Sequence, residues 1–109
     1  MKTNPDVQLD ALGDPTRRAV LQLLRNGPMP VSAIAKEFPI SRPAISQHLR
    51  VLKQAGLVTD SAVATRRLYE LNPEAFVSLR AYFDEFWPVA LGEFKKRAEL
   101  RRGKRRKSG

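Results

Sequence analysis

Apolar residues recur at about every third or fourth position along several segments of this chain, the spacing that places them on one side of an α-helix. Each segment begins near a residue that caps helices or at a proline, and most end near glycine or proline. The pattern predicts helices over residues 7–12, 15–25, 31–38 and 41–55, and a long final helix from residue 73.

The pattern changes after the fourth predicted helix. Residues 57–59 begin a strand and residues 67–71 alternate as a second one, so the short polar link over 60–66 predicts a hairpin. In the final helix, Pro88 cannot donate a backbone hydrogen bond, which predicts a kink or break over residues 84–87. The predicted fold is mainly α with a small β-hairpin, in the order of a winged helix-turn-helix domain.

Length and composition limit the possibilities further. The chain has 109 residues, the length of one domain, and we expect that domain to span residues 1–100. Residues 101–109 are basic with nothing apolar to pack, so a disordered tail is expected there. The N-terminus lacks the apolar run of a signal peptide, and no segment has the length of a membrane span, so we expect a cytoplasmic protein.

Several kinds of chemistry are excluded by the residues present. The chain contains no cysteine, which removes disulfides, thiolate metal sites and a cysteine nucleophile, and suits a reducing compartment. One histidine without cysteine makes no metal site, and we find neither a paired-carboxylate cleft nor a glycine-rich phosphate loop. We therefore expect a protein that is not an enzyme and that holds no cofactor or metal.

The fourth predicted helix has the features of a helix that reads DNA. If Ile45, Leu49 and Leu52 are buried, the opposite side of the helix must face away from the protein. That side carries Arg42, Pro43, Ser46, Gln47 and Arg50. Long donors mixed with short side chains suit the major groove, which admits one helix. The alternative is a polar helix face that is merely solvated.

Specific roles follow from the side-chain chemistry. Arg42 suits a bidentate contact to guanine and Gln47 one to adenine, and such contacts discriminate between bases. Ser46 is short and would contact a base edge or a phosphate at close range. Arg50 lies one turn further on, where a phosphate contact is the better expectation.

The charge of the chain is unevenly distributed. Residues 41–67 contain five basic residues against one acid, a net charge of +4, whereas residues 68–94 carry −4. This asymmetry gives the molecule one preferred face for phosphate. Residues 95–107 hold nine Lys and Arg against one acid, and we expect this tail to add phosphate contacts that are independent of sequence, with a solubilising role as the alternative.

Two further positions are candidates for contacts to DNA. Arg66 and Arg67 begin the second strand with side chains on opposite faces. Of the two, Arg66 is the one we expect to reach DNA from the predicted hairpin, which is the wing of a winged helix-turn-helix domain. The alternative for either arginine is an ion pair with Asp60 or Glu70. His48 lies at the edge of the buried stripe, where it can hydrogen-bond within the motif or contact a phosphate.

Three stretches, residues 12–18, 41–49 and 52–58, resemble the ArsR family of bacterial repressors. The resemblance covers roughly residues 7–95. It implies a dimeric winged helix that binds an imperfect inverted repeat in a promoter and is released by a signal. It also implies that Val31 and Ser32 lie near phosphate. The full set of candidate DNA contacts is Val31, Ser32, Ser41, Arg42, Pro43, Ser46, Gln47, His48, Arg50 and Arg66.

The chain departs from the metal-sensing members of that family. These carry a Cys-x-Cys motif on the helix corresponding to residues 31–38, or His and Asp pairs on the last helix, and neither is present. The chain therefore resembles the metal-independent branch, similar to the sporulation-delay repressors. Ala64 stands where the family usually has glycine, which argues against a tight turn with positive φ in the wing.

The final helix has more aromatic residues than a short domain needs for its core. Part of this stripe must pack within the chain, and the rest predicts a homodimer interface. The candidate interface residues are Val7, Leu12, Phe76, Phe83, Phe86, Trp87 and Phe94. The alternatives are that every aromatic is core, or that some line a pocket for an unidentified apolar effector.

A winged helix that binds RNA or another protein is the second function we consider. RNA recognition usually places exposed aromatic residues on a sheet or loop, and the only aromatic residue of the predicted hairpin is Tyr69. Double-stranded DNA is therefore the favoured partner.

Overall fold

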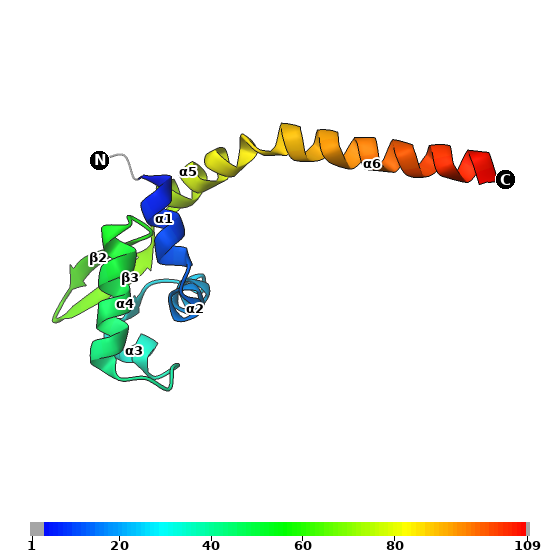
Figure 1. The fold of residues 1–109 in the computed structure, drawn as a ribbon. Helices are drawn as coiled ribbons and strands as arrows, with labels where there is room; N and C mark the ends of the chain where they lie inside the picture. Colours follow the sequence, from blue (N-terminus) through cyan, green and yellow to red (C-terminus); the bar gives the residue numbers. More distant parts are fainter. Residues whose placement is uncertain (1–3, 109) are drawn as a thin grey trace. The chain divides into compact units, whose positions relative to one another are not determined.

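The structure is a computed structural model that describes the backbone of residues 4–108 and the side chains of residues 4–102. The chain divides into two compact units, Met1–Leu79 and Arg80–Gly109. The helices are α1 (Pro5–Leu12), α2 (Pro15–Leu24), α3 (Val31–Ala35), α4 (Arg42–Gln54), α5 (Pro73–Asp84) and α6 (Trp87–Ser108) (Figure 1). The strands are β1 (Met29–Pro30), β2 (Val58–Val63) and β3 (Arg66–Leu71).

Side-chain caps define where three of the helices begin. The side chains of Asn4, Asp14 and Ser41 accept backbone N–H groups in the first turns of α1, α2 and α4, and each helix has a proline among its first two residues. Pro30 precedes α3 without any side-chain cap. The α-helical part of α3 is five residues, shorter than predicted, because the chain beyond it closes tighter turns in which the N–H of Glu37 donates to Ile34.

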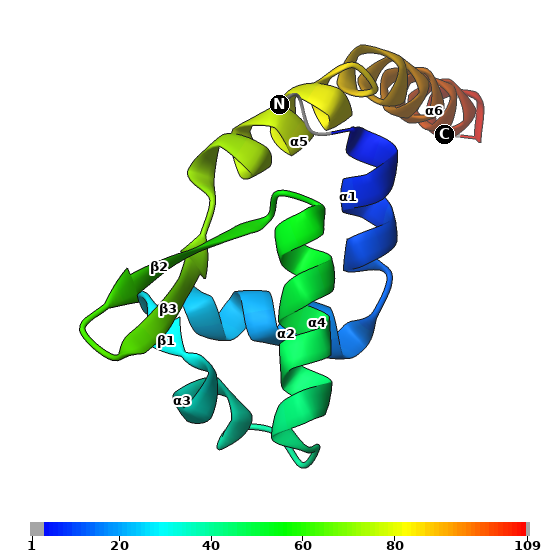
Figure 2. The same ribbon diagram turned by 90° about the vertical axis from the view of Figure 1, so that its left-hand side faces the viewer.

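The core of the first unit surrounds α4. Ile45, Leu49 and Leu52 have no exposed surface, which confirms the predicted buried stripe. Helix α4 contacts α1, α2, α3 and β2, and Figure 2 shows α1 running beside α4. Buried residues of the surrounding elements complete the core, among them Val20, Ile34, Leu57 and Val58.

The sheet has three antiparallel strands in the order β1-β3-β2. The predicted hairpin is confirmed, but its strands are longer than the sequence suggested, and β2 and β3 pair from Val58 with Leu71 to Val63 with Arg66. Strand β1 was not predicted, because two residues are too few to show alternation. It pairs Met29 with Tyr69.

The turn of the hairpin corrects one expectation from the sequence. Only Ala64 and Thr65 separate the strands, and Ala64 has φ of 56°, in the left-handed region. A two-residue hairpin turn requires positive φ in order to match the twist of its strands. The alanine therefore adopts a conformation that glycine would adopt at lower energy.

Replacing Ala64 with glycine is expected to stabilise the protein by about 0.5–1 kcal/mol, because relief of the left-handed strain exceeds the entropy that glycine adds to the unfolded chain. Urea unfolding monitored by circular dichroism measures the change. Ala62→Gly, in the extended part of β2, is the matched control and is expected to destabilise. An equal loss of stability in both variants would contradict the assignment of strain to Ala64.

The long final helix is interrupted, as predicted from Pro88. Helix α5 ends at Asp84 and α6 begins at Trp87, so that Pro88 is the second residue of a new helix, where a missing N–H is tolerated. Helix α6 extends to Ser108 and so runs into residues 101–109, whose disorder as a tail stays a prediction from the sequence. Lys, Arg, Glu, Ala and Leu all favour helix, so the backbone hydrogen bonds continue without tertiary packing. Among the described residues, no helix combines the length and the apolar character needed to cross a membrane.

Candidate nucleic-acid interface

The residues of α4 that we predicted to read DNA bases or contact phosphates, called the reading residues below, lie on the outward side of the helix and face solvent. Arg42, Pro43, Ser46, Gln47 and Arg50 are all exposed. Their direction is fixed because the opposite side of the same helix is fully buried. The surface that the sequence proposed for DNA is therefore available, and the rest of the first unit leaves it uncovered.

The start of α4 is built by Ser41 and the short helix α3. Ser41 Oγ accepts the N–H of Ala44 at 3.2 Å, which leaves the hydroxyl proton available to donate. Ile34 anchors α3 in the core, while Val31 is half-buried and Ser32 is exposed at the start of α3. These two residues are the first two of α3.

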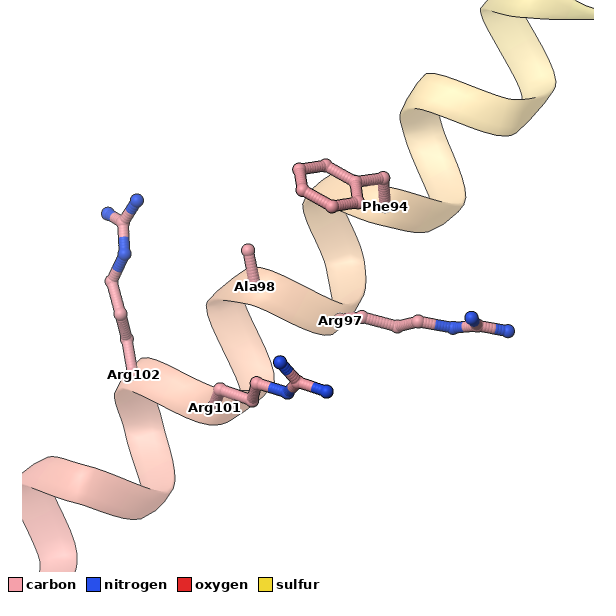
Figure 3. Close-up of a pocket in the computed structure, with 5 residues that line it drawn as sticks. All are labelled: Phe94, Arg97, Ala98, Arg101 and Arg102. Atoms are coloured by element: carbon pink, nitrogen blue, oxygen red, sulfur yellow. The ribbon is translucent and has the colours of Figure 1, made fainter.

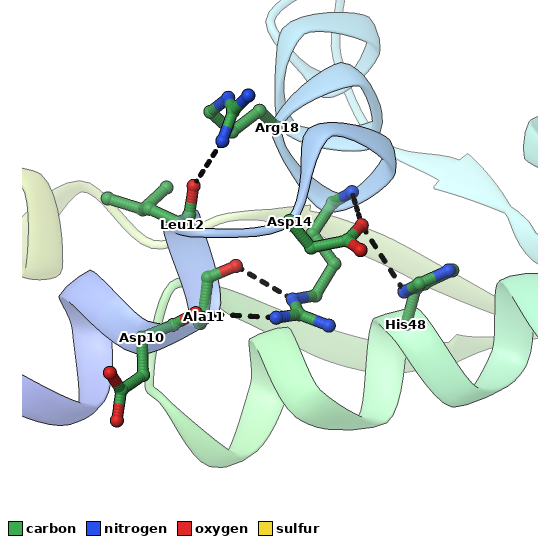
Figure 4. Close-up of polar contacts among 7 residues, drawn as sticks. Asp10, Ala11, Leu12, Asp14, Arg18 and His48 are labelled. Atoms are coloured by element: carbon green, nitrogen blue, oxygen red, sulfur yellow. Dashed lines mark hydrogen bonds and ion pairs between the residues drawn. The ribbon is translucent and has the colours of Figure 1, made fainter.

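His48 is directed toward the protein. It is half-buried, and its Nδ1 lies 3.9 Å from Oδ2 of Asp14, the cap of α2 (Figure 4). The Arg17 N–H bond to Asp14, together with the nearby charges of Arg17 and His48, lowers the pKa of Asp14. Of the predicted DNA contacts on α4, His48 is therefore the one that the structure connects to another helix.

The two arginines that follow Asp14 have a role that sequence reasoning missed. Arg17 Nε donates to the carbonyl of Ala11 at 2.7 Å, and Arg18 Nη1 donates to the carbonyl of Leu12 at 2.8 Å (Figure 4). Both guanidinium groups satisfy carbonyls at the end of α1, where a helix leaves its last acceptors without partners. The short connection between α1 and α2 was the feature of the sequence that could have predicted these contacts, because it keeps the start of α2 close to the end of α1.

The wing is tied to α4 through one carboxylate. Asp60 of β2 accepts from Lys53 Nζ at 2.8 Å and from Arg67 Nη1 at 2.7 Å. Arg67 is therefore engaged in the ion pair that was considered as its alternative. Arg66 is exposed, and no ion pair of Arg66 occurs among the described residues. This difference supports Arg66 as the basic residue of the wing that remains for DNA.

The same carboxylate makes a testable prediction about acid stability. The hydrogen bond from Lys53, followed by that from Arg67, lowers the pKa of Asp60 below its ordinary value. Because the pKa of Asp60 is lower in the folded protein than in the unfolded chain, its ion pairs stabilise the fold at pH values above the unfolded pKa near 3.8. This stabilisation is lost as the pH falls through the pKa of the folded protein. Asp60→Asn is expected to cost up to about 1 kcal/mol at pH 7, since both cations are half-exposed, and less than that at pH 3.

Urea unfolding at pH 7 and at pH 3 checks the expectation for Asp60. Asp10→Asn removes the same charge from an exposed residue of α1 that forms no ion pair among the described side chains. This control is expected to change stability little at either pH. A cost for Asp60→Asn that is the same at both pH values would show that the ion pairs are not its cause.

Two other kinds of site, a metal centre and a ligand pocket on α6, find little support in the described part of the chain. No group of three or more His, Cys, Asp or Glu residues in that part of the chain is placed to hold a metal ion. A hollow beside Phe94, Arg97, Ala98, Arg101 and Arg102 is bordered by α6 alone. Figure 3 shows these side chains projecting in different directions from one helix, so they do not converge on a ligand.

Comparison with known proteins agrees with this geometry. A family model described as a helix-turn-helix domain matches residues 12–60. The chain is 49% identical over 88 residues to the HTH-type transcriptional regulator Rv2034 of Mycobacterium tuberculosis, covering 81% of this chain and 82% of the relative. A crystal structure of the ArsR family transcriptional regulator RHA00566 superposes with a TM-score of 0.72 at 32% identity, covering 77% of this chain and 92% of the other.

A third relative is described as an assembly of two copies. It is the solution structure of the homodimeric winged helix-turn-helix DNA-binding domain Mb0332 from Mycobacterium bovis, with a TM-score of 0.62 at 28% identity. The match covers 73% of this chain and 78% of that domain. The relatives are regulators of transcription and not enzymes, as the sequence predicted.

Proposed function

Because this chain belongs to the ArsR family of winged helix-turn-helix transcriptional regulators, we propose that it is a homodimeric repressor that binds an inverted repeat in promoter DNA. The observation that carries the proposal is the two-sided character of α4. Its inner side is completely buried, and its outer side exposes Arg42, Ser46 and Gln47. This is the arrangement that a helix needs in order to enter the major groove.

Each exposed residue is assigned a contact that suits its chemistry. Arg42 reads guanine and Gln47 reads adenine, while the short Ser46 and Pro43 allow the helix to approach the base edges. Positioning contacts to phosphate complete the interface, and they come from Val31, Ser32, Ser41, Arg50 and Arg66. His48 acts on DNA only indirectly, through its position beside Asp14.

The homodimer is supported by apolar side chains that a single chain leaves exposed. In the second unit Phe83, Phe86, Trp87 and Phe94 are 45–71% exposed, and in the first unit Val7 is 45% exposed. Large exposed apolar surfaces usually mark interfaces. A two-fold axis would place the two reading helices roughly 34–36 Å apart, one turn of DNA.

Two residues of the predicted interface have a partner within their own chain. Leu12 and Phe76 are half-buried and pack against the core of the first unit. We therefore place them at the edge of the proposed interface and assign its centre to the more exposed aromatic residues of the second unit.

We also propose that the protein belongs to the metal-independent branch of the family. The chain has no cysteine, and the described residues contain no cluster of potential ligands. Regulation by a bound metal ion would need ligands that these residues do not provide.

The alternative of an RNA-binding winged helix has little support. Tyr69, the aromatic residue of the hairpin, is half-buried beside the core and pairs with Met29 across the sheet. The partial burial of Tyr69 leaves less of its ring for a base to stack on.

Selection of genomic fragments by the purified protein tests the proposed function. We expect enrichment of short inverted repeats that lie in promoters, and binding that structured RNA does not compete away. Enrichment without a repeat, or efficient competition by RNA, would contradict the proposal. A reporter gene placed behind the selected promoter then shows whether binding represses transcription.

Deleting residues 101–109 is expected to weaken binding to all duplex DNA by a similar factor and to reduce the dependence on salt, since each lost phosphate contact lowers the salt slope by about 1. The measurement is the dissociation constant for operator and for random DNA at several salt concentrations. A loss confined to the operator would mean that the tail reads sequence.

A further inference from the structure

A groove with a volume of about 290 Å³ opens on the first unit, between the ends of four elements. It is lined by Leu12 at the end of α1, by one face of α2, by Leu71 at the end of β3 and by Phe76 in α5. None of the residues assigned to DNA lies in it. Two of its lining residues, Leu12 and Phe76, also lie at the edge of the proposed dimer interface, and the DNA contacts leave the rest of the groove unexplained.

The lining has two chemically distinct parts. The floor is apolar and consists of Leu12, Leu21, Leu71 and Phe76. The rim is supplied by Arg18 and Gln22 on the exposed face of α2 and by Arg25, which directly follows that helix. A floor of hydrocarbon with two cations on one side matches a ligand that has an apolar chain and a negative end.

The two arginines are held at the rim by neutral partners only. Arg18 Nη1 donates to the carbonyl of Leu12 at 2.8 Å, and Arg25 Nη1 donates to Gln22 Oε1 at 2.9 Å. No ion pair of either arginine occurs among the described residues. Each guanidinium has five donors, so both retain donors for a carboxylate.

We propose that this groove binds an amphipathic carboxylate, such as the anion of a medium-chain fatty acid. The carboxylate binds at the cationic rim that Arg18 and Arg25 supply, and the acyl chain covers the apolar floor. The volume lies just below the range of ligand pockets, roughly 300–1,000 Å³, so a chain of moderate length fits better than a larger lipid.

Occupancy of the groove is expected to influence the regulator through α1. A carboxylate on Arg18 engages the same guanidinium that donates to the Leu12 carbonyl, the hydrogen bond that joins the end of α1 to α2. Helix α1 also carries Val7 of the proposed dimer interface. This regulatory step rests on the proposed function, whereas the binding step does not.

Titration of the full-length protein with decanoate, below its micelle-forming concentration, tests the binding step. Calorimetry measures affinity, and NMR of methyl groups shows whether Leu12, Leu21 and Leu71 respond. We expect saturable binding of decanoate and much weaker binding of decanol, which lacks the charge, and of acetate, which lacks the chain. Equal binding of decanoate and decanol would overturn the assignment of the rim.

Arg18→Gln combined with Arg25→Gln is expected to weaken decanoate binding roughly tenfold or more, because hydrogen bonds to a charged group are lost. Both side chains are exposed, so the fold should tolerate the change. Lys36→Gln combined with Arg80→Gln removes the same charge outside the groove and should leave the affinity unchanged. If both double variants weaken decanoate binding equally, decanoate is attracted by the net charge of the protein alone, and the groove is not a specific binding site.

A second copy of the chain is the competing occupant of the groove. In that case decanoate fails to bind, and the double arginine variant instead changes the dimer dissociation constant measured by sedimentation. That result overturns this inference and leaves the proposed DNA function intact. If the protein binds decanoate but binds no operator, the groove inference stands and the proposed DNA function is wrong.

Discussion

Replacing Arg42 and Gln47 together with alanine is expected to abolish the preference for the operator while the protein remains folded. Each side chain is assigned a bidentate contact to a base, and each such contact contributes about 1–3 kcal/mol of discrimination. The combined loss therefore corresponds to roughly thirtyfold to twenty-thousandfold in the ratio of operator to random-DNA affinity. Fluorescence anisotropy with both DNA molecules at one salt concentration measures this ratio.

The single variants and a matched control make this expectation specific. Arg42→Ala should relax the preference at one position of each half-site, and Gln47→Ala at another. Arg50→Ala removes an exposed arginine of the same helix that is assigned to phosphate. It should weaken operator and random DNA about equally. A preserved operator preference in the double variant would show that another surface reads the bases.

Replacing Phe86 and Phe94 together with glutamate is expected to convert the protein to monomers and to lower operator affinity by roughly a hundredfold or more, because two linked reading heads bind much more tightly than one. Both side chains are more than half exposed in the single chain, so its fold does not depend on them. Sedimentation at low micromolar concentration gives the mass, and anisotropy gives the affinity.

Val63→Glu is the control for the sedimentation experiment. Val63 is 51% exposed at the tip of the wing, outside the proposed interface, so this variant should remain dimeric. A wild-type protein that sediments as a 12.3 kDa species at the same concentration would remove the homodimer from the proposal.

The sequence predicted the helices and the hairpin well, because strong local signals specify them. Asp14 before Pro15 and Ser41 before α4 are caps whose effect is local, and the structure confirms both. The buried stripe of α4 follows from helical periodicity alone. Strand β1 was missed because its two residues become a strand only by pairing with β3, which lies far along the chain.

For the candidate interface too, the sequence predicted the features that local periodicity specifies and missed those that depend on contacts between elements. Periodicity correctly predicts that Arg42, Ser46 and Gln47 face outward. It gives no information about Asp60, which engages Lys53 and Arg67 across elements and leaves Arg66 as the exposed basic residue of the wing. Nor does it show that the Arg17 guanidinium folds back onto α1. Such contacts depend on how elements pack, which spacing along one element does not reveal.

Helix α4 is both the centre of the core and the carrier of the reading residues. Substitutions on its outer side meet only solvent, so new operator preferences can evolve with little cost in folding. The inner side has the opposite constraint, because tilting or sliding the helix would open the core. An inducing signal is therefore expected to alter the separation or the pairing of two rigid subunits, and the shape of each reader should be the same in the repressing and the released states.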